Sequence, residues 1–156
     1  MYAPKRRPAL RLAAPAFFAA LALALPAGAA ASNASLKRTL TTWSHRIGAD
    51  ARGIGLSATR RHPRRMTRRA NHFRHDALLA RRALAVQKPS TARGRRARAL
   101  ALAAFGNYAM VGREWALSGT ARLHHHKALA DRYALVAKRF AGKGNSMLVA
   151  AARLLR

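Results

Sequence analysis

The stretch MTRRANHFRHDALLARRAL, residues 66–84, places apolar side chains alternately four and three residues apart. This spacing keeps them on one face of an α-helix, because a helical turn contains 3.6 residues. The apolar positions are Met66, Ala70, Phe73, Ala77, Ala80 and Leu84. We therefore predict an amphipathic helix over residues 64–87 that packs through this face against other helices.

The segments on either side of this stretch also show helical spacing, and none alternates with the period of a strand. Residues 35–61 predict a helix that starts at Ser35, although three glycines weaken it. The dipeptide His62-Pro63 ends this helix and opens the next, because the residue before a proline is driven out of the helical conformation. Asp50 falls on the inward face of this first helix.

The second half of the chain predicts further helices over residues 91–118 and 121–141. Ser118-Gly119-Thr120 separates them, and residues 142–145 form a glycine-rich turn before a short last helix. Short connections between long helices place neighbours antiparallel. The expected fold is all-α: an antiparallel up-down helical bundle of four main helices plus a short C-terminal helix.

The first 31 residues have the pattern of a signal peptide, followed by a single basic domain over residues 32–156. A positive segment precedes the apolar run Leu12–Leu25, and small residues follow it. We expect cleavage near Ala29 or Ala31 and export to the periplasm or the cell exterior, by either the general or the twin-arginine route. The alternative is that Leu12–Leu25 stays attached as a membrane anchor.

Charge is the dominant feature of the composition. The chain carries 31 Lys and Arg against four Asp and Glu, a formal net charge of +27, and it has no Cys. A hydrophobic content of 51% is too high for a disordered polycation. Disulfide and thiolate chemistry are excluded, and four carboxylates leave little for acid–base catalysis. We expect a non-catalytic protein without a cofactor.

An excess of cations this large predicts an anionic partner, because the chain cannot neutralise its own repulsion. We expect an acidic polymer or an anionic membrane surface, with nucleic acid bound only non-specifically. The alternatives are a solvated surface without a ligand, or an acidic protein that docks on Leu78 and Leu79. The sequence leaves the oligomeric state open. The residues assigned to anion contact are Arg64, Arg65, Arg68, Arg69, Arg93, Arg95 and Arg96.

The carboxylates fall one on each predicted main helix, at Asp50, Asp76, Glu114 and Asp131. A di-metal bundle site is excluded because it requires Glu-x-x-His motifs, and this chain has none. We expect each acid to pair with an arginine of a neighbouring helix. The weak candidates for metal binding are His72, His75, His124, His125 and His126, and we predict that they form no site because consecutive histidines on a helix point apart.

Overall fold

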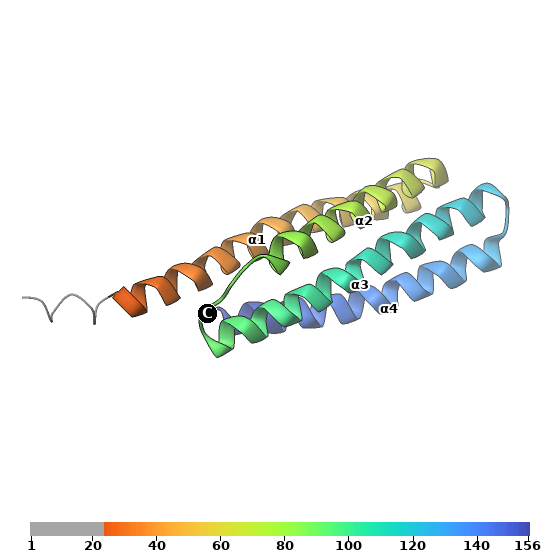
Figure 1. Ribbon diagram of the computed structural model, residues 1–156. Coiled ribbons are helices and arrows are strands. Elements are labelled where there is room, and N and C mark those ends of the chain that lie inside the picture. The colour runs from red at the N-terminus through yellow and green to blue at the C-terminus, as the bar shows by residue number, and fades with distance from the viewer. Residues whose placement is uncertain (1–23) are drawn as a thin grey trace, which may run out of the picture.

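The computed structural model describes residues 24–156, with side chains from residue 32 onward, and these residues form four α-helices without a strand (Figure 1). α1 spans Ala24–Thr59, α2 Pro63–Ala85, α3 Ala92–Leu123 and α4 Lys127–Leu154. The all-helical fold class is confirmed. Most of the predicted signal peptide, including all but two residues of Leu12–Leu25, lies outside the described residues.

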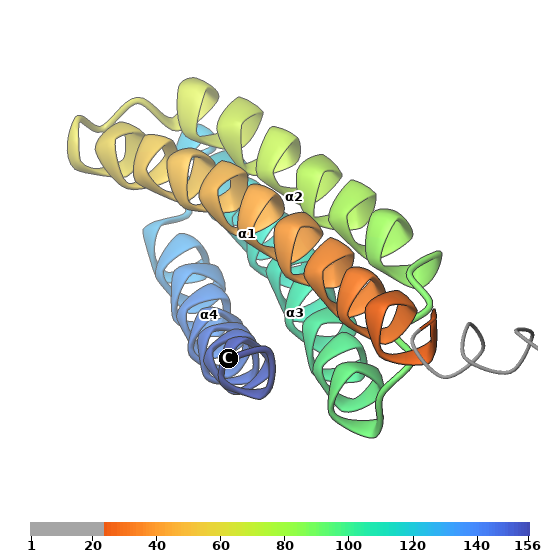
Figure 2. The same cartoon turned by 90° about the vertical axis from the view of Figure 1, so that its left-hand side faces the viewer.

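The helices pack in chain order. α3 makes extensive contacts with both α2 and α4, whereas α1 packs mainly on α2 and touches α3 only slightly. α4 lies alongside α3 (Figure 1), and Figure 2 shows α4 set apart from α1. The bundle is therefore not closed between its first and last helices.

The core lies where the predicted face of α2 meets α3. All six predicted α2 core positions are buried. The ring of Phe73 packs edge-on against Tyr108 of α3, with their centroids 6.1 Å apart. Gly112 of α3 lies directly on the α2 backbone, where an added Cβ would stand 2.7 Å from the carbonyl oxygen of Ala70. The small residues of α3 thus permit a close approach of α2.

α1 begins earlier than predicted and passes through its glycines without a break. It starts at Ala24, inside the segment assigned to the signal peptide, rather than at Ser35. Alanine is the strongest helix former, and the proline at position 26 lies in the first turn, where it removes no helical hydrogen bond. Ser35 therefore lies inside α1 and is not its N-cap. Its hydroxyl donates to Gln87 Oε1 at 3.1 Å.

α3 continues through the predicted break at Ser118-Gly119-Thr120 and ends at Leu123. Ser118 is fully buried, and its hydroxyl donates to the Ala130 carbonyl oxygen of α4 at 2.9 Å. Gly119 faces α2, where a Cβ would lie 3.1 Å from the Pro63 carbonyl oxygen. These residues serve packing between helices rather than termination, and the turn falls later, at residues 124–126.

α4 likewise runs without a break through residues 142–145, so the separate short C-terminal helix is wrong for the described chain. Gly144 is buried against the ring of Tyr108, where an added Cβ would stand 2.8 Å from Cε1. The glycine is required by contact between α3 and α4 and not by a turn. This contact was invisible in the local sequence because its partner lies 36 residues away.

Candidate functional site

The arginines assigned to anion contact lie in two groups at opposite ends of the molecule. Arg64, Arg65 and Arg68 are exposed in the first turns of α2, whereas Arg93, Arg95 and Arg96 are exposed in the first turns of α3. Figure 1 shows that α2 and α3 begin at opposite ends. Arg69 differs from the others because it is half-buried, with its guanidinium against Gly53 of α1. The seven residues therefore do not form one continuous surface.

The end that carries the start of α2 gains further cations from elsewhere in the chain. The α1–α2 turn and the α3–α4 turn meet there, and Arg61 and His62 line a hollow of about 520 Å³ together with Arg122 and His125. An adjacent hollow of about 400 Å³ is lined by residues of the α2 N-terminus and by Leu123. We call this surface the basic end and define it as Arg60, Arg61, His62, Arg64, Arg65, Arg68, Arg122, His124, His125, His126 and Lys127.

Little negative charge opposes the basic end. Of the four carboxylates, Asp131 lies beside it, and that carboxylate is already paired with Arg122 at 3.2 Å. α2 and α4 both begin here, with no acidic residue in the first turn and no side-chain cap. The C-termini of α1 and α3 lie at the same end and oppose the dipoles of these two N-termini, so the positive charge comes from the side chains. The basic end is therefore strongly electropositive.

The arginine group at the opposite end is partly engaged in holding the α2–α3 connection. Arg95 Nη1 donates to the Ser90 carbonyl oxygen at 2.8 Å. Arg98 donates to the carbonyl oxygens of Leu84 and Ala85, at 3.1 and 2.8 Å, and so caps the C-terminus of α2. Thr91 caps α3, since its hydroxyl accepts from the Gly94 amide. Arg93 and Arg96 make no such bond among the described residues.

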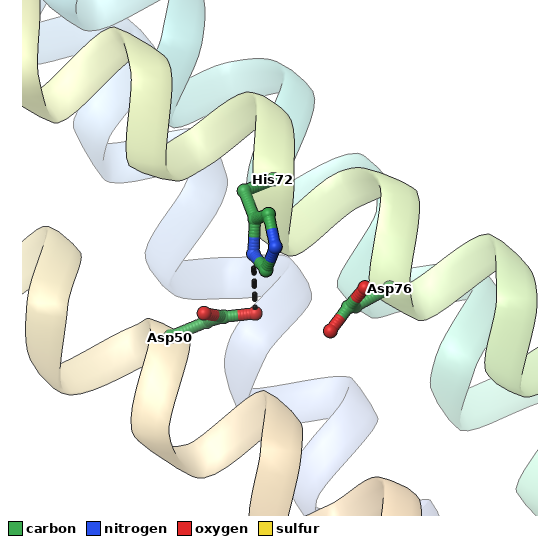
Figure 3. Close-up of side chains that lie close together, drawn as sticks. All are labelled: Asp50, His72 and Asp76. Carbon is green, nitrogen blue, oxygen red and sulfur yellow. Dashed lines mark hydrogen bonds and ion pairs between the residues drawn. The ribbon is translucent and has the colours of Figure 1, made fainter.

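A cluster of charged side chains joins α1 to α2 near the middle of the molecule (Figure 3). His72 Nδ1 lies 3.1 Å from Asp50 Oδ2, and Arg46 Nε lies 3.0 Å from Asp76 Oδ2. Arg46 and Asp50 are four residues apart on α1, as are His72 and Asp76 on α2. An ion pair and a histidine–carboxylate hydrogen bond therefore cross between the helices side by side, although the Arg46–Asp76 ion pair lacks hydrogen-bond geometry at Oδ2.

Within this cluster the buried carboxylate is that of Asp76 and not, as predicted, that of Asp50. Asp50 was expected to point inward, but its side chain is 19% exposed, whereas the side chain of Asp76 is 3% exposed. Asp76 follows Phe73 by three residues and precedes Ala80 by four, so helical spacing alone was a signal that it faces the core. Its burial is compensated by Arg46, as expected for the rare acids. The same expectation is wrong for Asp50, which contacts His72, and for Glu114, whose partner is Arg113 of its own helix.

The same cluster contains one of the predicted histidines but not the others. One ligand atom each from Asp50, His72 and Asp76 lies within 4.8 Å of the other two, a donor set that suits a divalent cation. Arg46 already places a positive charge on the buried carboxylate. His75 is not a member of the group, and the exposed rings of His124 and His126 stack on one another with centroids 6.5 Å apart. We interpret the cluster as an ion-pair network between α1 and α2.

The two leucines that were the alternative docking site for an acidic protein do not form a prominent apolar surface. Leu78 and Leu79 are both half-buried, and Leu78 packs against the core. The exposed large hydrophobic residues lie elsewhere, for example at Leu56, Val86 and Leu135.

Comparisons with known proteins give no relative: no protein family, curated protein or solved structure matches this chain. Among the described residues, no helix is both long enough and apolar enough to cross a bilayer.

Proposed function

We propose that this chain is an exported, non-catalytic protein that binds acidic polymers or anionic surfaces of the cell envelope through its basic end. The observation that carries the proposal is the meeting of two cation-rich turns at one end, where the nearby carboxylate is already neutralised. Arginine dominates this surface, and its planar fork matches phosphate and carboxylate groups. Nucleic acid would bind to the same charge without base readout.

The proposal includes an antiparallel up-down order of the helices. Support comes from pairs of contacts whose residue numbers run in opposite directions on neighbouring helices. Along α3 and α4, Ser118 bonds Ala130 while Tyr108 bonds Asn145. Along α1 and α2, Arg46 pairs with Asp76, whereas Asp50 contacts His72, so the residue numbers again run in opposite directions. This order brings the two turns of the basic end together.

Export is the remaining part of the proposal and is supported by the N-terminal sequence alone. Cleavage near Ala29 or Ala31 would remove the first turns of α1 and leave the basic end intact, since every residue of that surface lies at position 60 or beyond. N-terminal sequencing of the secreted protein tests this part. An uncleaved chain held in the membrane fraction would contradict it.

The binding proposal is tested by titrating the protein with a teichoic-type polymer, anionic vesicles and duplex DNA at several salt concentrations. We expect affinity to fall steeply as salt rises, because binding releases counterions from the polyanion. The variant R64Q/R68Q should weaken binding and lower the salt slope by about two. Its matched control is R93Q/R96Q, which removes the same charge from the opposite end and should change the affinity much less.

Two outcomes would contradict the proposal. Absence of binding to all three probes in dilute buffer, or an affinity that does not change with salt, would exclude an electrostatic polyanion site. Equal losses in the two double variants would show that net charge alone attracts the polymer and that the basic end is not a site.

A further inference from the structure

The side of the molecule on which α1 and α4 fail to meet contains a groove. A cavity of about 370 Å³ lies between them, with Ile47 and Ile54 on the α1 wall and Ala141 and Leu148 on the α4 wall. A second cavity of about 440 Å³ shares Ser44 and Leu148 with the first and continues toward Leu40. Volumes of this size are typical of small-molecule sites.

The groove is long and mainly apolar. From Leu40 to Gly55 it follows α1 for about 22 Å, at a helical rise of 1.5 Å per residue. Phe73, Tyr108 and Trp115 line it from α2 and α3. This shape suits an extended chain better than a compact ligand.

Two of the polar groups that line the middle of the groove are already engaged. The Tyr108 hydroxyl donates to Asn145 Oδ1 at 2.6 Å, and the Ser44 hydroxyl donates to the Leu40 carbonyl oxygen at 2.7 Å. The walls therefore offer apolar contact rather than a set of free hydrogen-bonding groups. A ligand with a long hydrocarbon part matches this surface, because burial of methylene groups supplies the binding energy.

Charge at the edge of the groove favours an anionic ligand. The Arg52 guanidinium lies beside Gly48, where an added Cβ would stand 3.8 Å from Nη1. None of the residues that line either cavity is a carboxylate. All four carboxylates of the chain are paired with other residues, so none of them neutralises Arg52.

The glycines of the α1 wall leave the groove open. Gly48 and Gly55 are two helical turns apart and both line the first cavity. Neither has a positive φ, and an added Cβ would meet only Arg52 at Gly48 and nothing within 4 Å at Gly55. Neither backbone conformation nor close helix packing requires glycine at these positions. Their effect is to keep the space between α1 and α4 unfilled, at a cost in helix propensity.

From these observations we infer that the groove binds a long-chain fatty acid, with the hydrocarbon chain along α1 and the carboxylate at Arg52. This activity goes beyond polyanion binding and uses none of the residues of the basic end. The two are also separable by salt, because burial of a hydrocarbon chain persists at salt concentrations that screen surface charges.

The test is a titration of the full chain with palmitate below its critical micelle concentration, in 0.5 M salt, followed by calorimetry and tryptophan fluorescence. We expect saturable binding at one site, and affinity should rise about fourfold per methylene in a series of shorter acids. G48L and G55L should each reduce the affinity at least tenfold by filling the groove. In a second titration at 0.01 M salt, where the charge of the exposed Arg52 is not screened, R52Q should weaken palmitate binding but leave binding of the neutral alcohol hexadecanol unchanged.

The matched control is G142L, which adds the same side chain to a helical glycine that has nothing within 4 Å and does not line the groove. Circular dichroism confirms that each variant is folded. Equal affinity in G48L and G142L, or no palmitate binding by the wild-type chain, overturns the inference. A wild-type dimer that G48L converts to a monomer would overturn it in favour of a second copy as the occupant. If R64Q/R68Q loses polymer binding but still binds palmitate, the groove binds its ligand independently of the basic end, as inferred.

Discussion

Tyr108 joins three of the four helices through one side chain. Its ring packs edge-on against Phe73 of α2 and Phe105 of α3, and it forms the surface on which Gly144 of α4 rests. Its hydroxyl reaches Asn145 on α4. Burial raises the pKa of Tyr108 to about 12, because the phenolate would lose its hydration in this position.

Tyr108 makes stability depend on pH in the alkaline range. Its folded-state pKa lies above the unfolded value of about 10, so its contribution is complete below pH 10 and is lost as the pH rises to about 12. The loss amounts to up to about 3 kcal/mol in the free energy of unfolding. Urea unfolding between pH 9 and pH 12 should show a decline that is absent in Y108F. Y133F is the control and should decline like the wild type, and parallel curves for wild type and Y108F would contradict the assignment.

At the residue scale, sequence reasoning also located the four carboxylates but not their environments. Helical spacing placed Asp50 inward, whereas the structure shows that Asp76 and Glu114 are buried and that Asp50 is not. Asp76 lies on the core face of α2, as its spacing from Phe73 and Ala80 indicates, whereas Asp50 lies beside His72 and is partly exposed.

At the scale of single helices, α4 shows how one residue type can serve different purposes. Gly142 and Gly144 looked like parts of one turn, yet both lie inside a continuous helix. Gly144 is pressed against Tyr108, whereas Gly142 is exposed with nothing within 4 Å of an added Cβ.

Substitution of these two glycines by alanine should therefore have opposite effects. G142A should stabilise the protein by up to about 1 kcal/mol, because alanine has the higher helix propensity and meets no neighbour. G144A should be destabilising by about 1–3 kcal/mol, because its Cβ overpacks the contact with Tyr108. Chemical denaturation of both variants measures the difference. A loss of stability in G142A would indicate the predicted turn instead of a continuous helix.

At the scale of the whole molecule, charge is distributed over both ends and the exposed helix faces. Four carboxylates cannot offset 31 cations, so folding brings together like charges that the unfolded chain keeps farther apart. The ion-pair network between α1 and α2 offsets this repulsion only locally. Ions or a polyanion that screen the remaining charges therefore stabilise the folded state.

This repulsion predicts that salt stabilises the protein. Between 0.01 M and 0.15 M sodium chloride the screening length falls from about 30 Å to about 8 Å. The melting temperature should rise by several degrees over this range and should rise less in R64Q/R68Q, which carries less charge. A melting temperature that is constant or falls with salt would show that the cations are too well hydrated or too far apart to oppose folding.

The sequence by itself determined the helical class, the core face of α2, the start of α2 at Pro63 and the cationic character. Each of these depends on local spacing, local backbone chemistry or simple composition. Only the tertiary structure decided that residues 118–120 and 142–145 lie within helices, because their glycines and serine make contacts with distant segments. It also decided that the predicted arginines divide between two ends and that α1 and α4 leave a groove, since helix crossings depend on side chains far apart in the chain.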